Sequence, residues 1–298
     1  MIRLHRRLAR AAESGPISIC IPVSICLAAL LITACTKQIN PRINAGGAGG
    51  RTAYFNLSED LLAQLKNTQN TIYVLIDSSD TSIGKLPPPP FYQSPMPYFN
   101  ASDGFFTQFP TDPINNMQPQ PWVRYNPLSP GNHTLILIDS GQHPIDTTML
   151  ATSSSDTLSI FYSDSLGNYR TFLVRDTLRP QPAVTGLRII DLSPDAGKLI
   201  FTINRAPATG FPDTLQYGTI SPFVNRNASA AGDTLKIRFY NPADTTTALA
   251  RTTLYTQPGH GYTVVLAGYA QSESYTNSYR GRQVSIATDL RVMLYQNY

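Results

Sequence analysis

Histidines are the side chains that could most readily exchange protons near neutral pH, and three of the four lie beyond residue 35. His133 opens an apolar run, whereas His143 and His260 stand in glycine-containing turns. None is spaced from another as a metal ligand would be, and neither a Gly-x-Ser-x-Gly nor a His-Glu-x-x-His motif occurs. We interpret all three as solvated turn histidines and predict no catalytic residue, no metal site and no cofactor.

Carboxylates are the second set of candidates, because two acidic side chains flanking a sugar can hydrolyse a glycosidic bond. Beyond residue 35 the only glutamates are Glu59 and Glu273. Aspartates are more numerous, but most precede Thr or Ser where a strand is expected to begin. There an Asp side chain can close a turn while the β-branched Thr enters the strand. We predict a protein that is not an enzyme, with a glycan-acting hydrolase using paired Asp carboxylates as the alternative.

Some polar triplets leave two interpretations open. Ser193-Pro194-Asp195 could bind a metal or a ligand, but its side chains can equally tie a turn through nearby backbone groups, which we favour. The recurrent Asp-(Ser/Thr)-Leu and Asp-Thr-Thr triplets could be turns or acceptor sites for O-linked glycans, and turns are again favoured.

An aromatic and proline-rich insert, residues 85–122, is the best candidate for binding. Aromatic faces offer a large contact area at low entropic cost and can stack on sugar rings or peptides, and proline-rich segments are preformed for recognition. The alternative is that these rings cover the open end of a sandwich. The candidate binding residues are Phe91, Tyr92, Tyr98, Phe99, Phe105, Phe106, Phe109 and Trp122.

Residues 1–34 are predicted to be a signal peptide, because a stretch with four arginines precedes an apolar run. The run ends in Ile32-Thr33-Ala34-Cys35, which resembles the bacterial lipobox. That resemblance implies cleavage before Cys35 and lipid on its thiol, which would hold the protein at a membrane. An uncleaved anchor helix is the alternative. Thr36 stands where an Asp would retain a lipoprotein in the inner membrane, so we expect the outer membrane.

Removing this segment changes both charge and cysteine content. It carries most of the formal charge of +4, and no Lys/Arg cluster remains that could follow a nucleic-acid backbone. Cys20 and Cys26 leave with it, so the folded part must be stable without disulfides. We predict no nucleic-acid partner.

The rest of the chain has the composition and pattern of an all-β protein. Residues 35–51 carry glycine pairs without apolar periodicity and predict a flexible tether. Ser58 could cap one short helix. Short apolar runs rich in β-branched and aromatic residues predict strands. These runs are 71–77, 133–139, 156–162, 169–175, 187–192, 198–204, 234–240, 248–255 and 262–269. We expect two tandem antiparallel β-sandwich (immunoglobulin-like) domains, over 52–178 and 187–298.

Three sequence segments of the first half recur in the second half in the same order, which indicates a tandem duplication. The matched pairs of segments are 53–60 with 188–195, 131–150 with 232–250, and 154–170 with 258–274.

The duplication makes specific structural predictions. Leu57 should match Leu192, Leu135 should match Leu235 and Leu137 should match Ile237, all at inward positions. Each domain should bury its own core, with few contacts across residues 176–186. The insert should leave the second copy as the plainer one.

The second copy resembles the DUF4397 family over residues 187–270. The resemblance is carried by Leu-Ser-Pro-Asp-Ala at 192–196, Tyr-Gly-Thr-Ile-Ser at 217–221 and GHGYTVVLAG at 259–268. It is weaker in the first copy, where Glu59 replaces the proline and the insert intervenes. The resemblance implies tandem β-sandwich-like domains of bacterial lipoproteins and secreted proteins, with no assigned activity.

Taken together, these features predict a membrane-anchored extracytoplasmic lipoprotein. We expect it to act as a non-catalytic binding or structural module of the cell envelope, with an envelope glycan or protein as its candidate partner.

Overall fold

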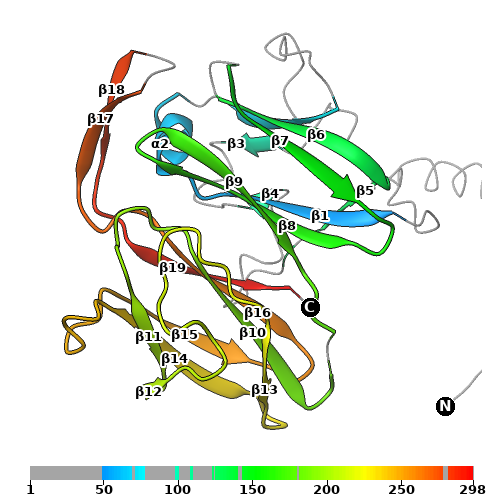
Figure 1. Cartoon of the computed structure of the whole chain (residues 1–298), viewed down its shortest axis with the longest axis vertical. Helices are drawn as coiled ribbons and strands as arrows, with labels where there is room; N and C mark the ends of the chain where they lie inside the picture. Colours follow the sequence, from blue (N-terminus) through cyan, green and yellow to red (C-terminus); the bar gives the residue numbers. More distant parts are fainter. Residues whose placement is uncertain are drawn as a thin grey trace, which may run out of the picture. The chain divides into compact units, whose positions relative to one another are not determined.

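A computed structural model describes residues 49–68, 71–77, 98–100, 108–109, 123, 125–139, 143–179, 181–277 and 281–297. Within these residues the protein is all-β, as predicted, with a single helix, α2 (Glu59–Thr68) (Figure 1). Each of the nine apolar runs forms a strand. Ser58 caps α2 as expected, because its hydroxyl accepts the Leu61 backbone N–H at 3.2 Å. No described helix has the length and apolar character that a membrane span requires.

Two sheets facing each other form the first sandwich (Figure 1). Sheet 1 has the order β4 (Gln108–Phe109), β1 (Gly50–Asn56), β8 (Thr157–Ser165) and β9 (Asn168–Arg175), with β5 (Asn126–Leu128) also on β1. Sheet 2 has the order β3 (Tyr98–Asn100), β2 (Thr71–Ile76), β6 (Gly131–Ile138) and β7 (Pro144–Thr152). Because side chains alternate along a strand, one face of each sheet supplies the shared core, which includes Tyr54, Leu135 and Ile160.

The second sandwich repeats this arrangement. Sheet 3 has the order β13 (Val224–Asn227), β10 (Val184–Asp191), β16 (Gly261–Ala267) and β19 (Arg291–Gln296). Sheet 4 has the order β12 (Ala206–Pro207), β11 (Ile200–Ile203), β14 (Asp233–Tyr240) and β15 (Ala250–Thr256). Its core includes Leu187, Ile237 and Val264. Among the described strands, each sandwich contains one parallel pair, β1 with β8 and β10 with β16.

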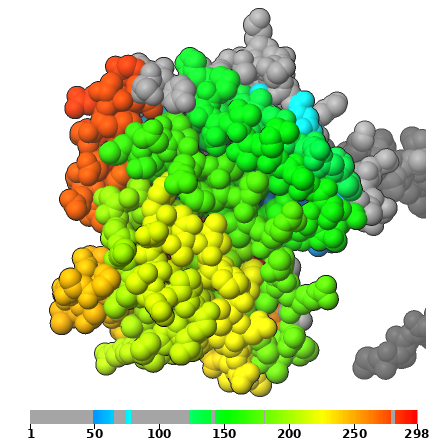
Figure 2. Space-filling model, in the orientation of Figure 1, coloured from blue at the N-terminus to red at the C-terminus, as the bar shows by residue number. Residues whose placement is uncertain are grey.

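A third apolar core lies between sheet 1 and sheet 3. There Phe55 stacks on Phe161 with ring centroids 4.6 Å apart and meets Tyr295 edge-on at 4.7 Å. The prediction of few contacts across residues 176–186 is therefore wrong. All the described residues fall in one compact unit, and the space-filling view shows the two sandwiches in contact (Figure 2).

The third core has a simple physical cause in strands β8, β10 and β16. Nearly every residue of these strands is buried, so both of their faces must be covered. One face packs into the strand's own sandwich and the other packs against the neighbouring sandwich.

The repeated segments 53–60 and 188–195, which contain Leu57 and Leu192, occupy equivalent positions in the two sandwiches, as predicted. The Leu57 N–H donates to the Tyr162 carbonyl at 2.7 Å, and the Leu192 N–H donates to the Leu266 carbonyl at 2.8 Å. Both leucines nevertheless face the third core rather than the core of their own sandwich.

Asp77 and Asn204 fix the correspondence farther along the chain. Both have positive φ, 56° and 54°, directly after β2 and β11. The Asp77 side chain accepts the Thr134 backbone N–H at 2.8 Å, and the Asn204 side chain accepts that of Lys236 at 2.8 Å. Thr134 therefore corresponds to Lys236.

This correspondence corrects two predicted pairs. Leu135 matches Ile237 rather than Leu235, and Leu137 matches Phe239 rather than Ile237. All five side chains still point into their sandwich cores, because a shift of two residues preserves the face of a strand.

The predicted match of 131–150 with 232–250 also fails at the Pro-x-Asp-Thr-Thr sequence that each segment contains, at 144–148 and 242–246. Asp146 lies within β7, whereas Asp244 lies in the loop between β14 and β15. The Asp244 carboxylate accepts the Thr246 backbone N–H at 2.9 Å, so this second segment is a turn.

The predicted insert supplies an edge strand to each sheet of the first sandwich, as β12 and β13 do in the second. Within the predicted insert 85–122, β3 pairs with β2 and β4 pairs with β1, although no strand was predicted there. In the second copy β17 (Glu273–Asn277) and β18 (Arg282–Ile286) form a hairpin between β16 and β19. The second copy is therefore not the plainer one.

Candidate functional site

The predicted anchor and most of the predicted binding residues lie outside the described residues. These are Cys35, Phe91, Tyr92, Phe105, Phe106 and Trp122. Tyr98 and Phe99 lie in β3, and Phe109 lies in β4, where the structure describes the backbone and not the side chains. The aromatic-insert hypothesis thus stays a prediction.

The histidine interpretation is wrong for His133, which is buried with 5% of its surface exposed. Its Nδ1 lies 2.7 Å from Asp77 Oδ2, and its Nε2 lies 2.7 Å from the Ser129 carbonyl oxygen. Burial alone would lower the pKa of His133, but these two acceptors outweigh it and raise the pKa. His143 is exposed and His260 half-buried.

The Ser193-Pro194-Asp195 triplet has a structural role, as favoured, but its side chains bond to distant rather than nearby backbone groups. The Ser193 hydroxyl donates to the Gly268 carbonyl at 2.7 Å. The Asp195 carboxylate accepts the backbone N–H groups of Ala270 at 2.7 Å and Gln271 at 2.9 Å. Both side chains are thus used to fasten the end of β10 to the chain that leaves β16.

Asp60 and Asp164 are two buried carboxylates near the start of α2. Asp164 accepts the Ser58 hydroxyl at 2.6 Å, and burial raises its pKa. Asp60 accepts the Asn277 amide at 2.8 Å and the Tyr169 hydroxyl. These donors hold α2, the strands β8 and β9 and the β17–β18 hairpin together. The pair is bonded within the chain and is not a pair of carboxylates open to a glycan.

A buried ion pair joins the two halves of the chain. Arg188 Nη1 lies 2.6 Å from Asp176 Oδ1, with side chains 1% and 0% exposed. Arg188 also donates to the Thr263 hydroxyl at 2.9 Å, while Asp176 accepts the hydroxyls of Tyr125 at 2.6 Å and Ser159 at 2.8 Å. Because Asp176 follows β9 and Arg188 lies on β10, this network fixes the connection between the sandwiches.

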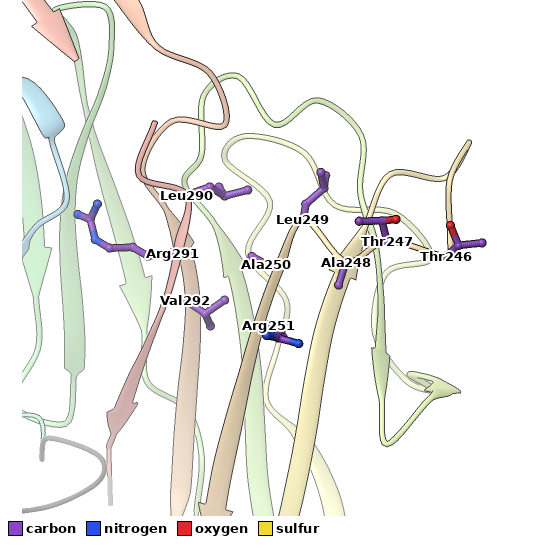
Figure 3. A pocket seen from close by; sticks show the side chains of 9 residues that line it. All are labelled: Thr246, Thr247, Ala248, Leu249, Ala250, Arg251, Leu290, Arg291 and Val292. Atoms are coloured by element: carbon purple, nitrogen blue, oxygen red, sulfur yellow. The ribbon is translucent and has the colours of Figure 1, made fainter. Parts of the chain in front are cut away.

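A groove of about 570 Å³ runs along the open side of the second sandwich, between β15 of sheet 4 and β19 of sheet 3 (Figure 3). Leu249, Leu290 and Val292 give it an apolar part, and Thr246 adds a hydroxyl. Arg291 points away from it in Figure 3 and binds Glu59 of α2 at 2.5 Å.

The outer face of sheet 4 adjoins this groove and is basic. Arg238 of β14 stands directly opposite Arg251 of β15, and Lys236 lies two residues before Arg238 on the same face. None of these three cations forms an ion pair with another described residue. Tyr255, on the same face of β15, is 55% exposed.

The sequence held a signal for this face that a search for contiguous basic runs misses. In the strand LKIRFY the cations alternate with Leu235, Ile237 and Phe239. Alternation sends the apolar residues to the core and the cations to the opposite face. The pairing with Arg251 depends on the register of β14 with β15, which the sequence alone does not give.

No protein-family model and no curated protein matches the chain. One similar solved structure is described as "Alpha-glucan binding by a streptococcal virulence factor". The match is 6% identical, covers 72% of this chain and 92% of that chain, and has a TM-score of 0.23. A structural likeness of this strength carries no argument about function. Because no family model matches, the DUF4397 resemblance stays a prediction.

Proposed function

We propose that this protein is a lipid-anchored module of the bacterial cell envelope that binds or supports other envelope components without catalysing a reaction. The observation that supports this best is the third core between sheet 1 and sheet 3. Together with the buried pair of Asp176 and Arg188, it joins two sandwiches into one body. Such a body presents the outer faces of sheets 2 and 4 in fixed positions, which suits a binding or structural role.

Anchoring rests on the Ile32-Thr33-Ala34-Cys35 segment. A lipidated Cys35 that carries more than one acyl chain would hold the protein stably at a membrane, because one chain alone binds only marginally. β1 begins at Gly50, two residues before the predicted domain boundary. The segment from Cys35 to Gly50 is then the connection between the lipid and the first sandwich, and the outer membrane is the proposed location.

Anchoring is tested by metabolic labelling with a palmitate analogue in the native host. The wild-type chain should be labelled and should enter the outer-membrane fraction. Cys35→Ala should be unlabelled and unprocessed, whereas Cys26→Ala, the matched control, should behave like the wild type. A wild-type protein that retains residues 1–34 and carries no lipid contradicts the anchor.

Binding is tested with the full chain purified in non-ionic detergent. We expect it to capture envelope polysaccharide or an envelope protein from solubilised envelopes, and to leave the captured material chemically unchanged. Time-dependent shortening of a captured glycan would contradict the non-catalytic role and would support the hydrolase alternative.

A further inference from the structure

We propose that the outer face of sheet 4 binds an acidic polysaccharide. The basic face consists of Lys236, Arg238, Arg251 and Tyr255, with Thr253 between the last two on β15. This inference rests on the proposed binding function and adds to it the place and the chemical class of the ligand.

Charge is the first support. Arg238 and Arg251 are directly opposite partners in the register of β14 and β15, an arrangement that is unfavourable for two like charges. Lys236 lies two residues before Arg238 on β14 and adds a third positive charge on the same face. No Asp or Glu occupies an outward position on β11, β14 or β15. An anionic ligand would relieve this repulsion, because the outward positions of these three described strands supply no counter-charge.

The first sandwich provides an internal comparison. The positions that correspond to Lys236 and Arg238 are Thr134 and Ile136, which are uncharged. The equivalent of Arg251 is Thr147, since Thr148 faces Leu135 as Thr252 faces Ile237. The same fold therefore forms without these cations. Their presence on sheet 4 is not required by the sandwich architecture.

The chemistry of the face favours sugar carboxylates over an isolated anion. An arginine guanidinium can hold a carboxylate through two parallel hydrogen bonds. Tyr255 is 55% exposed and presents an aromatic ring on which a sugar can stack, while the exposed Thr253 adds a hydroxyl between the ring and Arg251. The groove between β15 and β19 begins at Arg251 and lengthens this surface. A polymer with regularly spaced carboxylates on sugar rings fits all of these groups.

The test uses the full chain in non-ionic detergent and polygalacturonate as the acidic probe. Binding is measured by affinity electrophoresis and by isothermal titration at several salt concentrations, with amylose as the neutral glucan. The variant Arg238→Gln/Arg251→Gln removes the opposed pair. Arg226→Gln/Arg282→Gln removes the same charge from a half-buried position on β13 and an exposed position on β18 and is the matched control. Tyr255→Ala keeps every charge, and thermal unfolding checks that each variant is folded.

We expect polygalacturonate to bind, amylose to bind at least tenfold more weakly, and binding to weaken as salt increases. Arg238→Gln/Arg251→Gln should bind about tenfold more weakly, as the loss of two partly exposed charge contacts predicts. Tyr255→Ala should bind more weakly at every salt concentration, and the control should bind like the wild type.

Equal binding by Arg238→Gln/Arg251→Gln and the wild type would overturn the assignment to this face. Equal affinity for amylose, or equal affinity for a single-stranded oligonucleotide, would overturn the ligand class. Failure of the wild type to bind polygalacturonate would also overturn it. None of these results affects the Cys35 labelling or the capture of an envelope component, so failure of this inference is distinguishable from failure of the proposed function.

Discussion

Asp191→Asn should stabilise the protein above pH 7 and change it little near pH 4. Asp191 is fully buried at the end of β10. Its Oδ1 accepts the Ser193 backbone N–H at 3.0 Å, whereas its Oδ2 has no hydrogen-bond partner among the described residues. Burial therefore raises the pKa of Asp191 from 3.8 to about 7, and the one hydrogen bond opposes this only in part.

The size of the effect follows from this shift in pKa. One pKa unit corresponds to about 1.4 kcal/mol, so ionising Asp191 in the folded protein costs roughly 4 kcal/mol more than in the unfolded chain. Asparagine removes that cost but leaves an amide nitrogen without a partner, at about 1–3 kcal/mol. The net gain at pH 8 should be roughly 1–3 kcal/mol. The first sandwich already has this arrangement, because Asn56 Oδ1 accepts the Ser58 N–H at 3.2 Å.

The sign of the pH dependence is fixed by the raised pKa. The folded state binds the Asp191 proton more tightly than the unfolded state, so its contribution to stability is complete below the unfolded pKa. It is lost as the pH rises from about 4 to about 7. Thermal unfolding of wild type and Asp191→Asn should therefore coincide near pH 4 and diverge by several degrees at pH 8. Comparing the two proteins at each pH cancels the other groups that titrate.

The reciprocal substitution Asn56→Asp tests the same reasoning in the other sandwich. It should lower the melting temperature at pH 8 and have little effect at pH 4, because it places a carboxyl where Asn56 is 1% exposed. If Asp191→Asn is destabilising at pH 8, or shifts both pH values equally, burial of an ionised Asp191 is not the dominant effect.

The buried pair gives a second prediction. Asp176→Asn should lower the free energy of unfolding by about 3 kcal/mol, measured by chemical denaturation, because Arg188 loses its counter-charge. Asp176→Leu/Arg188→Met should lower it by less than a single change at either residue, because no buried charge is left uncompensated. Unfolding of the double variant at a lower denaturant concentration than both single variants would contradict this. His133→Leu places at this buried position the residue type found at the corresponding Leu235. The raised pKa of His133 stabilises the folded wild type at acidic pH, and this stabilisation is lost as the pH rises through that pKa. The variant should lack this pH-dependent stabilisation. Melting curves at pH 5.5 and pH 8 check this, and an unchanged pH profile would count against a charged His133. Gly268→Ala should cost about 2 kcal/mol, because Gly268 has φ +85° and an added Cβ would lie 2.0 Å from the Asp289 carbonyl oxygen; an unchanged melting temperature would contradict that close contact.

Much of the fold was predictable because its strands carry local signals. Runs such as TIYVLID and YTVVLAGY are rich in β-branched and aromatic residues, and each forms a strand. β7 was missed because PIDTTMLAT begins with proline and Asp146, Thr147 and Thr148 interrupt its apolar residues. Its strand character comes from pairing with β6 rather than from its own composition.

The interior sites were harder to predict because they depend on contacts far apart in the sequence. The Asp60–Asn277 hydrogen bond joins residues separated by 217 positions. His133 was predicted to be solvated because it stands at the start of an apolar run, yet it is buried and bonded to Asp77 and Ser129. For Ser193-Pro194-Asp195 the structural role was predicted correctly but the partners were not, because the side chains bond to Gly268, Ala270 and Gln271 rather than to nearby backbone groups.

The duplication and the third core have a common physical basis. A sandwich normally needs one covered face per sheet, and its strands then alternate apolar and polar residues. Strands such as β16, GYTVVLA, are buried along their whole length and would expose Val265 and Ala267 to water in a lone sandwich. A second copy with the same doubly apolar strands can cover that surface. Arg188 and Asp176 then fix the connection by a charged pair that is compensated only when both sandwiches are in place. The two copies are therefore expected to unfold together in a single transition, and separate melting of the two sandwiches in calorimetry would contradict this account.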